Sequence, residues 1–96
     1  MRVRVRVLGI LRKALGKDEL HVDVNAGGEV KLRDIIEAVL REAGSLRDIL
    51  LDPELKDPRP NTIILVNGRD ISILGGLDAH VRDGDEIVLI PVVHGG

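Results

Sequence analysis

The stretch IVLIPVVHGG, residues 87–96, decides the fold. Its first four residues are apolar without alternation, and a short run of this kind is typical of a strand whose two faces are both covered. Pro91 follows and has no N–H for a strand ladder, so we expect pairing to weaken there. We therefore predict one domain over residues 1–91 and a flexible diglycine tail over residues 92–96.

Two further strands are predicted near the N-terminus, because residues 2–8 (RVRVRVL) and 19–24 (ELHVDV) alternate between apolar and polar side chains. Opposite charges across two paired strands attract each other. We expect the outward arginines of the first strand to face the outward acids of the second, and the alternative is that the arginines form a binding patch. The outward residues are Arg2, Arg4 and Arg6 on the first strand, and Glu19, His21 and Asp23 on the second.

One principal helix is predicted over residues 32–42, where apolar residues recur at the helical spacing, with Gly44 ending it. A helical turn ended by Gly16 is expected before it. A short second helix is expected after it, started by a capping box of Ser45 and Asp48. The proline-rich segment 52–60 is predicted to be an exposed loop. The apolar stripe of the principal helix consists of Leu32, Ile35, Ile36, Val39 and Leu40.

The second half of the chain is predicted to be mostly strands. TIILV at 62–66 is a strand, Asn67 and Gly68 favour a tight hairpin turn, and RDISI at 69–73 can return as a short strand. Together these elements predict the α+β class: a mixed sheet of four to five strands packed on one main helix, with a short second helix.

The strands at 62–66 and 87–90 are apolar on both faces, yet the chain supplies one substantial helix, which covers one face of a sheet. We therefore expect the other face to expose aliphatic side chains, and such patches often mark partner sites. The alternative is that the second helix or the loop 52–60 folds over this face. The residues predicted to bind a partner here are Ile64, Val66, Val88 and Ile90.

Composition excludes several classes of protein. A net charge of −2 and the absence of aromatic residues argue against nucleic-acid binding. The chain has no cysteine, and His21 and His80 lack ligand spacing, so no metal site is expected. No apolar run is long enough to cross a membrane, no phosphate-binding glycine loop is present, and we expect a soluble cytoplasmic protein.

Three segments carry a resemblance to a known family: ILVNGRDI at 64–71, GLDAHVRDGDEIVLIP at 76–91, and the closing glycines. In this order they resemble the ubiquitin-like β-grasp sulfur carriers and modifiers. These are the small subunit of molybdopterin synthase, the thiamine-pathway sulfur carrier, the ubiquitin-related modifier and the small archaeal modifiers. The resemblance covers nearly the whole chain and implies a β-grasp fold.

The resemblance also implies a mechanism. An ATP-dependent adenylyltransferase of the ubiquitin-activating type would adenylate the carboxylate of Gly96, and sulfide would then give a thiocarboxylate. The chain would be a carrier rather than an enzyme, with no cofactor of its own, because ATP belongs to the activating enzyme. A large subunit of molybdopterin synthase or protein conjugation targets would be further partners. The tail residues expected to contact partners are Pro91, Val92, Val93, His94 and Gly95.

Two alternatives stay open. The chain can be a protein modifier that forms isopeptide bonds with lysines, or a non-catalytic binding module whose glycines are incidental. Glycines without a Cβ pass through a narrow slot that other residues cannot enter. The tail therefore favours activation at Gly96, for sulfur transfer or for conjugation.

Overall fold

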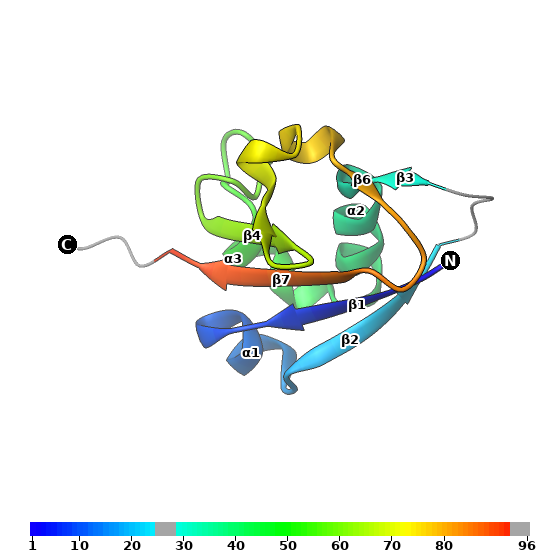
Figure 1. Ribbon diagram of the computed structural model, residues 1–96. Helices are drawn as coiled ribbons and strands as arrows, with labels where there is room; N and C mark the ends of the chain where they lie inside the picture. Colours follow the sequence, from blue (N-terminus) through cyan, green and yellow to red (C-terminus); the bar gives the residue numbers. More distant parts are fainter. Residues whose placement is uncertain (25–28, 93–96) are drawn as a thin grey trace.

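The structure is a computed structural model that describes residues 1–24 and 29–92. Five of its strands are β1 (Arg2–Val7), β2 (Glu19–Asp23), β4 (Thr62–Val66), β5 (Arg69–Asp70) and β7 (Glu86–Pro91). Within the described residues these strands form one five-stranded sheet in the order β2-β1-β7-β4-β5. The central strand β7 runs parallel to β1 and antiparallel to β4 (Figure 1). The predicted mixed sheet is confirmed.

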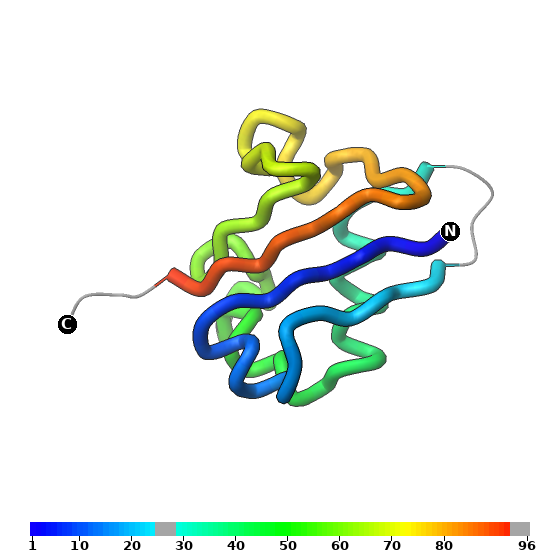
Figure 2. Tube along the Cα trace, turned by 60° about the horizontal axis from the view of Figure 1, so that its bottom comes forward, coloured from blue at the N-terminus to red at the C-terminus, as the bar shows by residue number. Residues whose placement is uncertain are grey.

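The helices lie on one side of this sheet. The principal helix is α2 (Leu32–Glu42), and the shorter ones are α1 (Gly9–Leu15), α3 (Arg47–Leu50) and the 3-10 helices η1 (Gly44–Leu46), η2 (Ile71–Ile73) and η3 (Gly76–Asp78). A second, two-stranded sheet pairs β3 (Val30–Lys31) with β6 (His80–Val81). Figures 1 and 2 show α2 and α3 behind the sheet, so its other face is left open.

The core lies between the sheet and α2. The three valines of β1 are fully buried while its arginines are exposed, which confirms the predicted alternation. Each aliphatic side chain buried in this way contributes about 1.5–3 kcal/mol to folding before entropy is counted. All five predicted stripe residues of α2 are buried as well: Leu32, Ile35, Ile36, Val39 and Leu40. The α+β class with one main helix is therefore confirmed.

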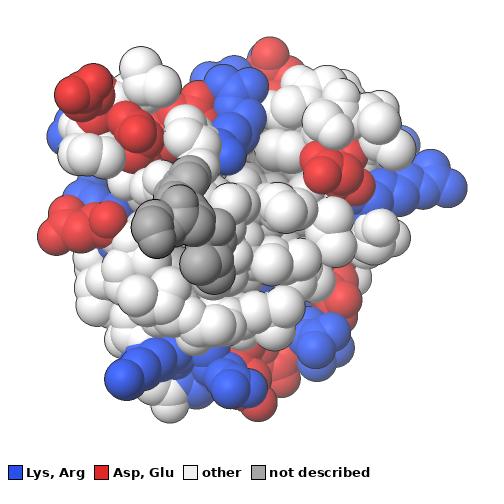
Figure 3. Space-filling view, turned by 90° about the vertical axis from the view of Figure 1, so that its left-hand side faces the viewer, with Lys and Arg blue, Asp and Glu red and all other residues white. Residues whose placement is uncertain are grey.

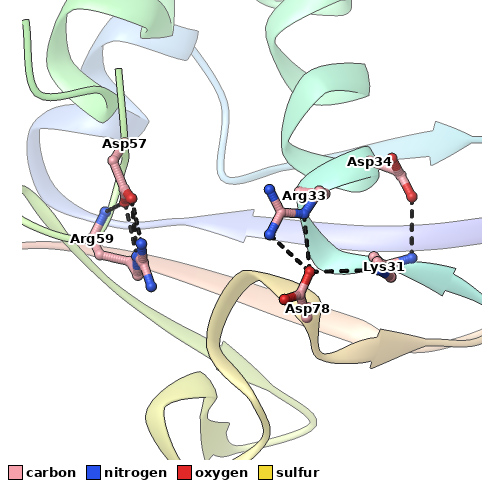
Figure 4. A network of polar contacts seen from close by, with 6 residues as sticks. All are labelled: Lys31, Arg33, Asp34, Asp57, Arg59 and Asp78. Carbon is pink, nitrogen blue, oxygen red and sulfur yellow. Dashed lines mark hydrogen bonds and ion pairs between the residues drawn. The ribbon is translucent and has the colours of Figure 1, made fainter. Parts of the chain in front are cut away.

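The polar contacts of Asp34 and Asp78 fix the start of α2. The Asp34 carboxylate accepts a hydrogen bond from the backbone N–H of Lys31 at 3.2 Å, which caps the first turn. The Asp78 carboxylate in η3 accepts from the Arg33 guanidinium at 2.7 Å (Figure 4). These contacts tie α2 to the segment that leads into β7.

Three local predictions need correction. Gly44 does not end α2, which stops at Glu42, and Gly44 instead opens η1. Ser45 does not cap the short helix α3: its hydroxyl donates to the carbonyl of Ala14 at 3.5 Å. RDISI is a strand only over Arg69–Asp70, because the Asp70 carboxylate accepts from the N–H of Ser72 at 2.9 Å and starts η2.

Pairing does not weaken at Pro91 as predicted. β7 includes Pro91, which lies opposite Thr62, and the N–H of Val92 donates to the carbonyl of Asn61 at 2.9 Å. In an antiparallel ladder only alternate residues bond to the same neighbour. The nitrogen of Pro91 faces away from β4, on the side where β1 has already ended, so its missing N–H costs no bond to β4.

In the part of the chain that the structure describes, no helix combines the length and the apolar character needed to cross a membrane.

Candidate partner-binding site

The open face of the sheet carries a group of aliphatic side chains on β7 and β4. Leu65 lies opposite Val88 and Ile63 opposite Ile90, and residues opposite each other in a ladder share a face. The side chain of Ile63 is 42% exposed, and the other three are partly buried by their neighbours. We call Ile63, Leu65, Val88 and Ile90 the aliphatic face.

The predicted partner residues Ile64 and Val66 are not on this face. They lie opposite Leu89 and Ile87, point into the core, and are 1% and 4% exposed. The prediction was wrong for these two residues because the strand is apolar at every position. Without alternation, the sequence does not show which side chains point outward. Val88 and Ile90 do lie on the open face, as predicted, and Ile63 and Leu65 were missed.

The alternative that the second helix or the loop 52–60 covers this face is also wrong. Lys56 and Pro58 of the loop and Arg47 of α3 line a groove together with α2 residues. Both views place α3 behind the sheet, on the side of α2 (Figures 1 and 2). The aliphatic face is therefore open in the described chain.

An ion-pair cluster borders the aliphatic face on β1 and β2. Arg4 contacts Glu19 across the strand pair, and its Nη1 lies 3.1 Å from Oε2 of Glu86. Arg6 lies 3.8 Å from the same Glu86 carboxylate. The hydrogen bond from Arg4 lowers the pKa of Glu19. Arg4 thus pairs with an acid of β2, as expected, whereas the acid near Arg6 is Glu86 of β7. Exposed pairs of this kind add little stability.

The chain leaves the sheet at Pro91 and Val92, and we call this point the exit. Contacts hold it on two sides. On one side Val92 donates to Asn61, and on the other the N–H of Leu8 donates to the carbonyl of Leu89 at 3.2 Å. Gly9, with a φ of +54°, packs closely on the Pro91 ring: a Cβ added to Gly9 would lie 3.0 Å from Cγ of Pro91. The direction in which the chain leaves β7 is therefore fixed up to Val92.

The aliphatic face continues to this exit. Val92 has the same parity as Val88 and Ile90, and its side chain is 37% exposed. Figure 3 views the molecule from the end where β7 finishes and shows a broad uncharged surface with charged side chains at its margins. The site thus combines a fixed exit, an apolar surface beside it and a charged border.

Four predicted site residues, Val93, His94, Gly95 and Gly96, lie outside the described residues. Of the other histidines, His21 lies opposite Arg4, and Nδ1 of His80 lies 2.8 Å from the carboxylate of Glu29. Across residues 1–24 and 29–92, no group of three or more histidines and acids is placed to hold a metal ion.

A mixed sheet wrapped around one main helix, with an open face beside the C-terminal exit, defines the ubiquitin-like β-grasp class. Comparison with known proteins agrees. The chain belongs to the ThiS family, which it matches over residues 5–96. This family consists of small sulfur carriers and modifiers rather than enzymes.

Two relatives align with the chain from end to end. It is 31% identical to "Ubiquitin-related modifier 1" of Schizosaccharomyces pombe over 100 residues, which covers 100% of both chains. It is 30% identical to "Sulfur carrier protein CysO" of Mycobacterium tuberculosis over 97 residues, again with 100% of both covered. The chain is therefore similar to carriers and to modifiers at nearly the same level.

Two solved structures share the fold. The crystal structure of SAMP1 from Haloferax volcanii superposes with a TM-score of 0.83 at 22% identity and 100% coverage of both chains, which confirms the β-grasp architecture. A chain of the BexX/CysO complex from Amycolatopsis orientalis superposes with a TM-score of 0.75 at 28% identity, covering 98% of this chain and 99% of that one. A protein of this fold has thus been crystallised with a partner.

Proposed function

We propose that this chain is a sulfur carrier whose Gly96 carboxylate is activated by a ubiquitin-activating-type adenylyltransferase. In the proposal, residues 1–91 are the scaffold and residues 92–96 the tail that enters the active site of the enzyme. The observation that carries it is the fixed exit at Pro91 and Val92 directly beside the aliphatic face. An enzyme that binds this face finds the point where the chain leaves β7 at a constant position.

The chemistry needs two steps. A carboxylate oxygen of Gly96 attacks the α-phosphorus of ATP and expels pyrophosphate, giving an acyl-adenylate. Sulfide then attacks the acyl carbon, the C–S bond forms, the bond to the adenylate oxygen breaks, and AMP leaves with its electron pair. The product is a thiocarboxylate. ATP and the catalytic groups belong to the enzyme, so this chain supplies the surface and the acyl group.

The partners in this proposal follow from the chemistry. The aliphatic face matches an apolar surface on the adenylyltransferase, and the ion-pair cluster at its border sets the orientation. The thiocarboxylate then passes its sulfur to an acceptor protein such as the large subunit of molybdopterin synthase, or to a tRNA-thiolating enzyme. A cytoplasmic location is part of the proposal, since a chain without cysteine fits a reducing compartment.

A second function is favoured by a specific observation. The chain aligns over its whole length with a ubiquitin-related modifier. In this version the same adenylate passes its acyl group to a lysine amine of a target protein and forms an isopeptide bond. A binding module without activation is the third reading.

Intact mass distinguishes these functions. The full chain is incubated with its cognate adenylyltransferase, ATP and sulfide, and a gain of about 16 Da on the full-length chain identifies the thiocarboxylate. Conjugates that disappear when Gly96 is deleted identify the modifier instead. A chain that gives neither product, while its deletion variant is fully competent in the cell, would overturn activation at Gly96.

A further inference from the structure

A groove on the helix side of the molecule lies on the opposite side of the sheet from the aliphatic face. It has a volume of about 630 Å³ and runs between α2, α3 and the loop 52–58, with Leu77 of η3 at its edge. Its size falls in the range of pockets that take up ligand side chains. The chemistry described so far uses none of its residues, so the groove is a separate feature.

The rim of the groove is positively charged although the chain as a whole carries −2. Glu37 is the one acid among the described residues that line it, against four cationic side chains, which leaves a formal charge of +3. Glu37 is one helical turn from both Arg33 and Arg41, so each arginine offsets part of its charge. The cationic residues are Arg33, Arg41, Arg47 and Lys56.

Most of this positive charge has no partner. Arg33 binds Asp78 at 2.7 Å (Figure 4). The other three cations have no carboxylate within 4.0 Å among the described residues. Asp48 and Asp52 line a smaller adjoining hollow of about 220 Å³ together with Arg47 and Lys56, and counting both acids still leaves a positive formal charge of +1. The rim is therefore suited to an incoming carboxylate.

The floor of the groove is apolar. Ile36, Leu40 and Leu51 line it, and Pro58 and Leu77 form its wall. Ile36, Leu40 and Leu51 are 5%, 8% and 8% exposed, so an apolar side chain laid on them adds a limited hydrophobic free energy to the charge contacts. The ligand that fits best therefore combines negative charge with an aliphatic or aromatic side chain.

The backbone at Lys56 supports a role for its charge. Lys56 has a φ of +56°, a conformation that favours glycine, and its N–H donates to the carbonyl of Asp52 at 2.8 Å. A glycine here would form the same turn with less strain. The chain instead carries a lysine whose side chain lines the groove.

From charge complementarity and the apolar floor, we infer that this groove docks an acidic peptide segment of a partner protein, with an apolar side chain on the floor and carboxylates against Arg41, Arg47 and Lys56. Because the groove and the aliphatic face lie on opposite sides of the sheet, one chain can hold both partners at once. Nucleic acid fits less well, since the described groove has no aromatic side chain on which a base could stack.

The test measures fluorescence anisotropy of the full chain with a labelled peptide of about 12 residues that alternates glutamates with leucines. Two matched peptides replace either the glutamates by lysine or the leucines by serine. We expect the acidic apolar peptide to bind at least about tenfold more tightly than either matched peptide, and its affinity to fall as salt is raised from about 50 to 300 mM.

Variants of the chain locate the binding. The double variant Arg47→Glu with Lys56→Glu should weaken binding of the peptide by about tenfold or more. The control Lys13→Glu with Lys17→Glu reverses the same number of charges outside the groove and should stay within about twofold. Lys56→Gly should weaken binding by about threefold without lowering the Tm, which separates the charge from the fold.

Several outcomes would overturn the inference. They are equal binding of all three peptides, equal loss in the control pair at Lys13 and Lys17 and in the groove pair at Arg47 and Lys56, or displacement of the peptide from the groove by a single-stranded oligonucleotide. None of these readouts involves Gly96, so they are independent of the outcome for the proposed sulfur carrier.

Discussion

Gly9 of α1 packs on the ring of Pro91 so closely that a Cβ at Gly9 would lie 3.0 Å from Cγ of Pro91. These two residues are far apart in the sequence, and their contact joins the first corner of the fold to the end of β7. Gly9 also has a φ of +54°. A side chain at this position therefore meets two independent costs, one from the backbone conformation and one from the contact with Pro91.

Gly9→Ala should lower the free energy of unfolding by about 2 kcal/mol. Alanine is strained in a left-handed backbone conformation, and its Cβ would contact the Pro91 ring too closely. Gly16→Ala is the matched control: Gly16 has a φ of +83°, but nothing lies within 4 Å of its added Cβ. Urea unfolding should give a loss about 1 kcal/mol smaller for the control. Equal losses would show that the Pro91 contact carries no energy.

The two faces of the sheet should respond in opposite ways to an introduced charge. Val88→Asp places a carboxylate on the open face beside Arg6, so the domain should stay folded while binding to the adenylyltransferase weakens by about tenfold or more. Ile64→Asp buries a charge in the core and should cost about 4 kcal/mol or more. Circular dichroism checks folding, and titration calorimetry checks binding. A folded Ile64→Asp variant would contradict the assignment of faces.

The sequence predicts both a strand and its buried face only where apolar and polar residues alternate along that strand. Residues 2–7 and 19–23 alternate, so both the strands and their buried valines were predicted correctly. Residues 62–66 and 87–90 are apolar throughout, so the strands were predicted but not their inner and outer faces. The packing of Ile64, Ile87 and Leu89 into the core shows which face points inward, and that core joins distant parts of the chain.

Local polar contacts explain why the predictions for residues 69–73 and for Ser45 were wrong. Asp70 binds the N–H of Ser72 and turns a predicted strand into a 3-10 helix, while Ser45 binds the carbonyl of Ala14 instead of capping α3. Short polar side chains can hydrogen-bond to several backbone groups. Which bond forms depends on neighbours in space that the sequence does not identify. The fixed exit at Val92 was missed for a similar reason, since Asn61 is its partner only once β4 and β7 have paired.

Thr62→Val should stabilise the protein. The Thr62 side chain is 3% exposed, and its hydroxyl has no hydrogen-bond partner among the described residues. A buried unpaired hydroxyl costs about 1–3 kcal/mol, and valine keeps nearly the same shape. We expect a gain of about 1 kcal/mol by urea unfolding. Thr62→Ser keeps the hydroxyl and loses a methyl group, so it should lose stability. A loss in Thr62→Val would mean that the hydroxyl has a partner in solution.

The ion pair of Asp57 and Arg59 should make stability depend on pH in acid. The hydrogen bond from the Arg59 guanidinium lowers the pKa of Asp57, whose side chain is 19% exposed. Because the folded pKa lies below the unfolded value of about 3.9, the pair stabilises the fold fully above that pH and loses its effect as the pH falls through the folded pKa. The contribution at neutral pH is less than about 1 kcal/mol, because the Arg59 side chain is largely exposed.

Asp57→Asn should therefore be less stable than the parent at pH 7, with the difference shrinking towards zero as the pH is lowered below about 4. Arg59→Gln should remove the same increment, and the double variant should lose no more than either single variant, because the increment belongs to the pair. Urea unfolding across this pH range measures all four chains. If the difference between Asp57→Asn and the parent stayed constant from neutral to acid pH, the loss would come from the backbone contact of Asp57 with the N–H of Arg59, at 2.8 Å, and not from its charge.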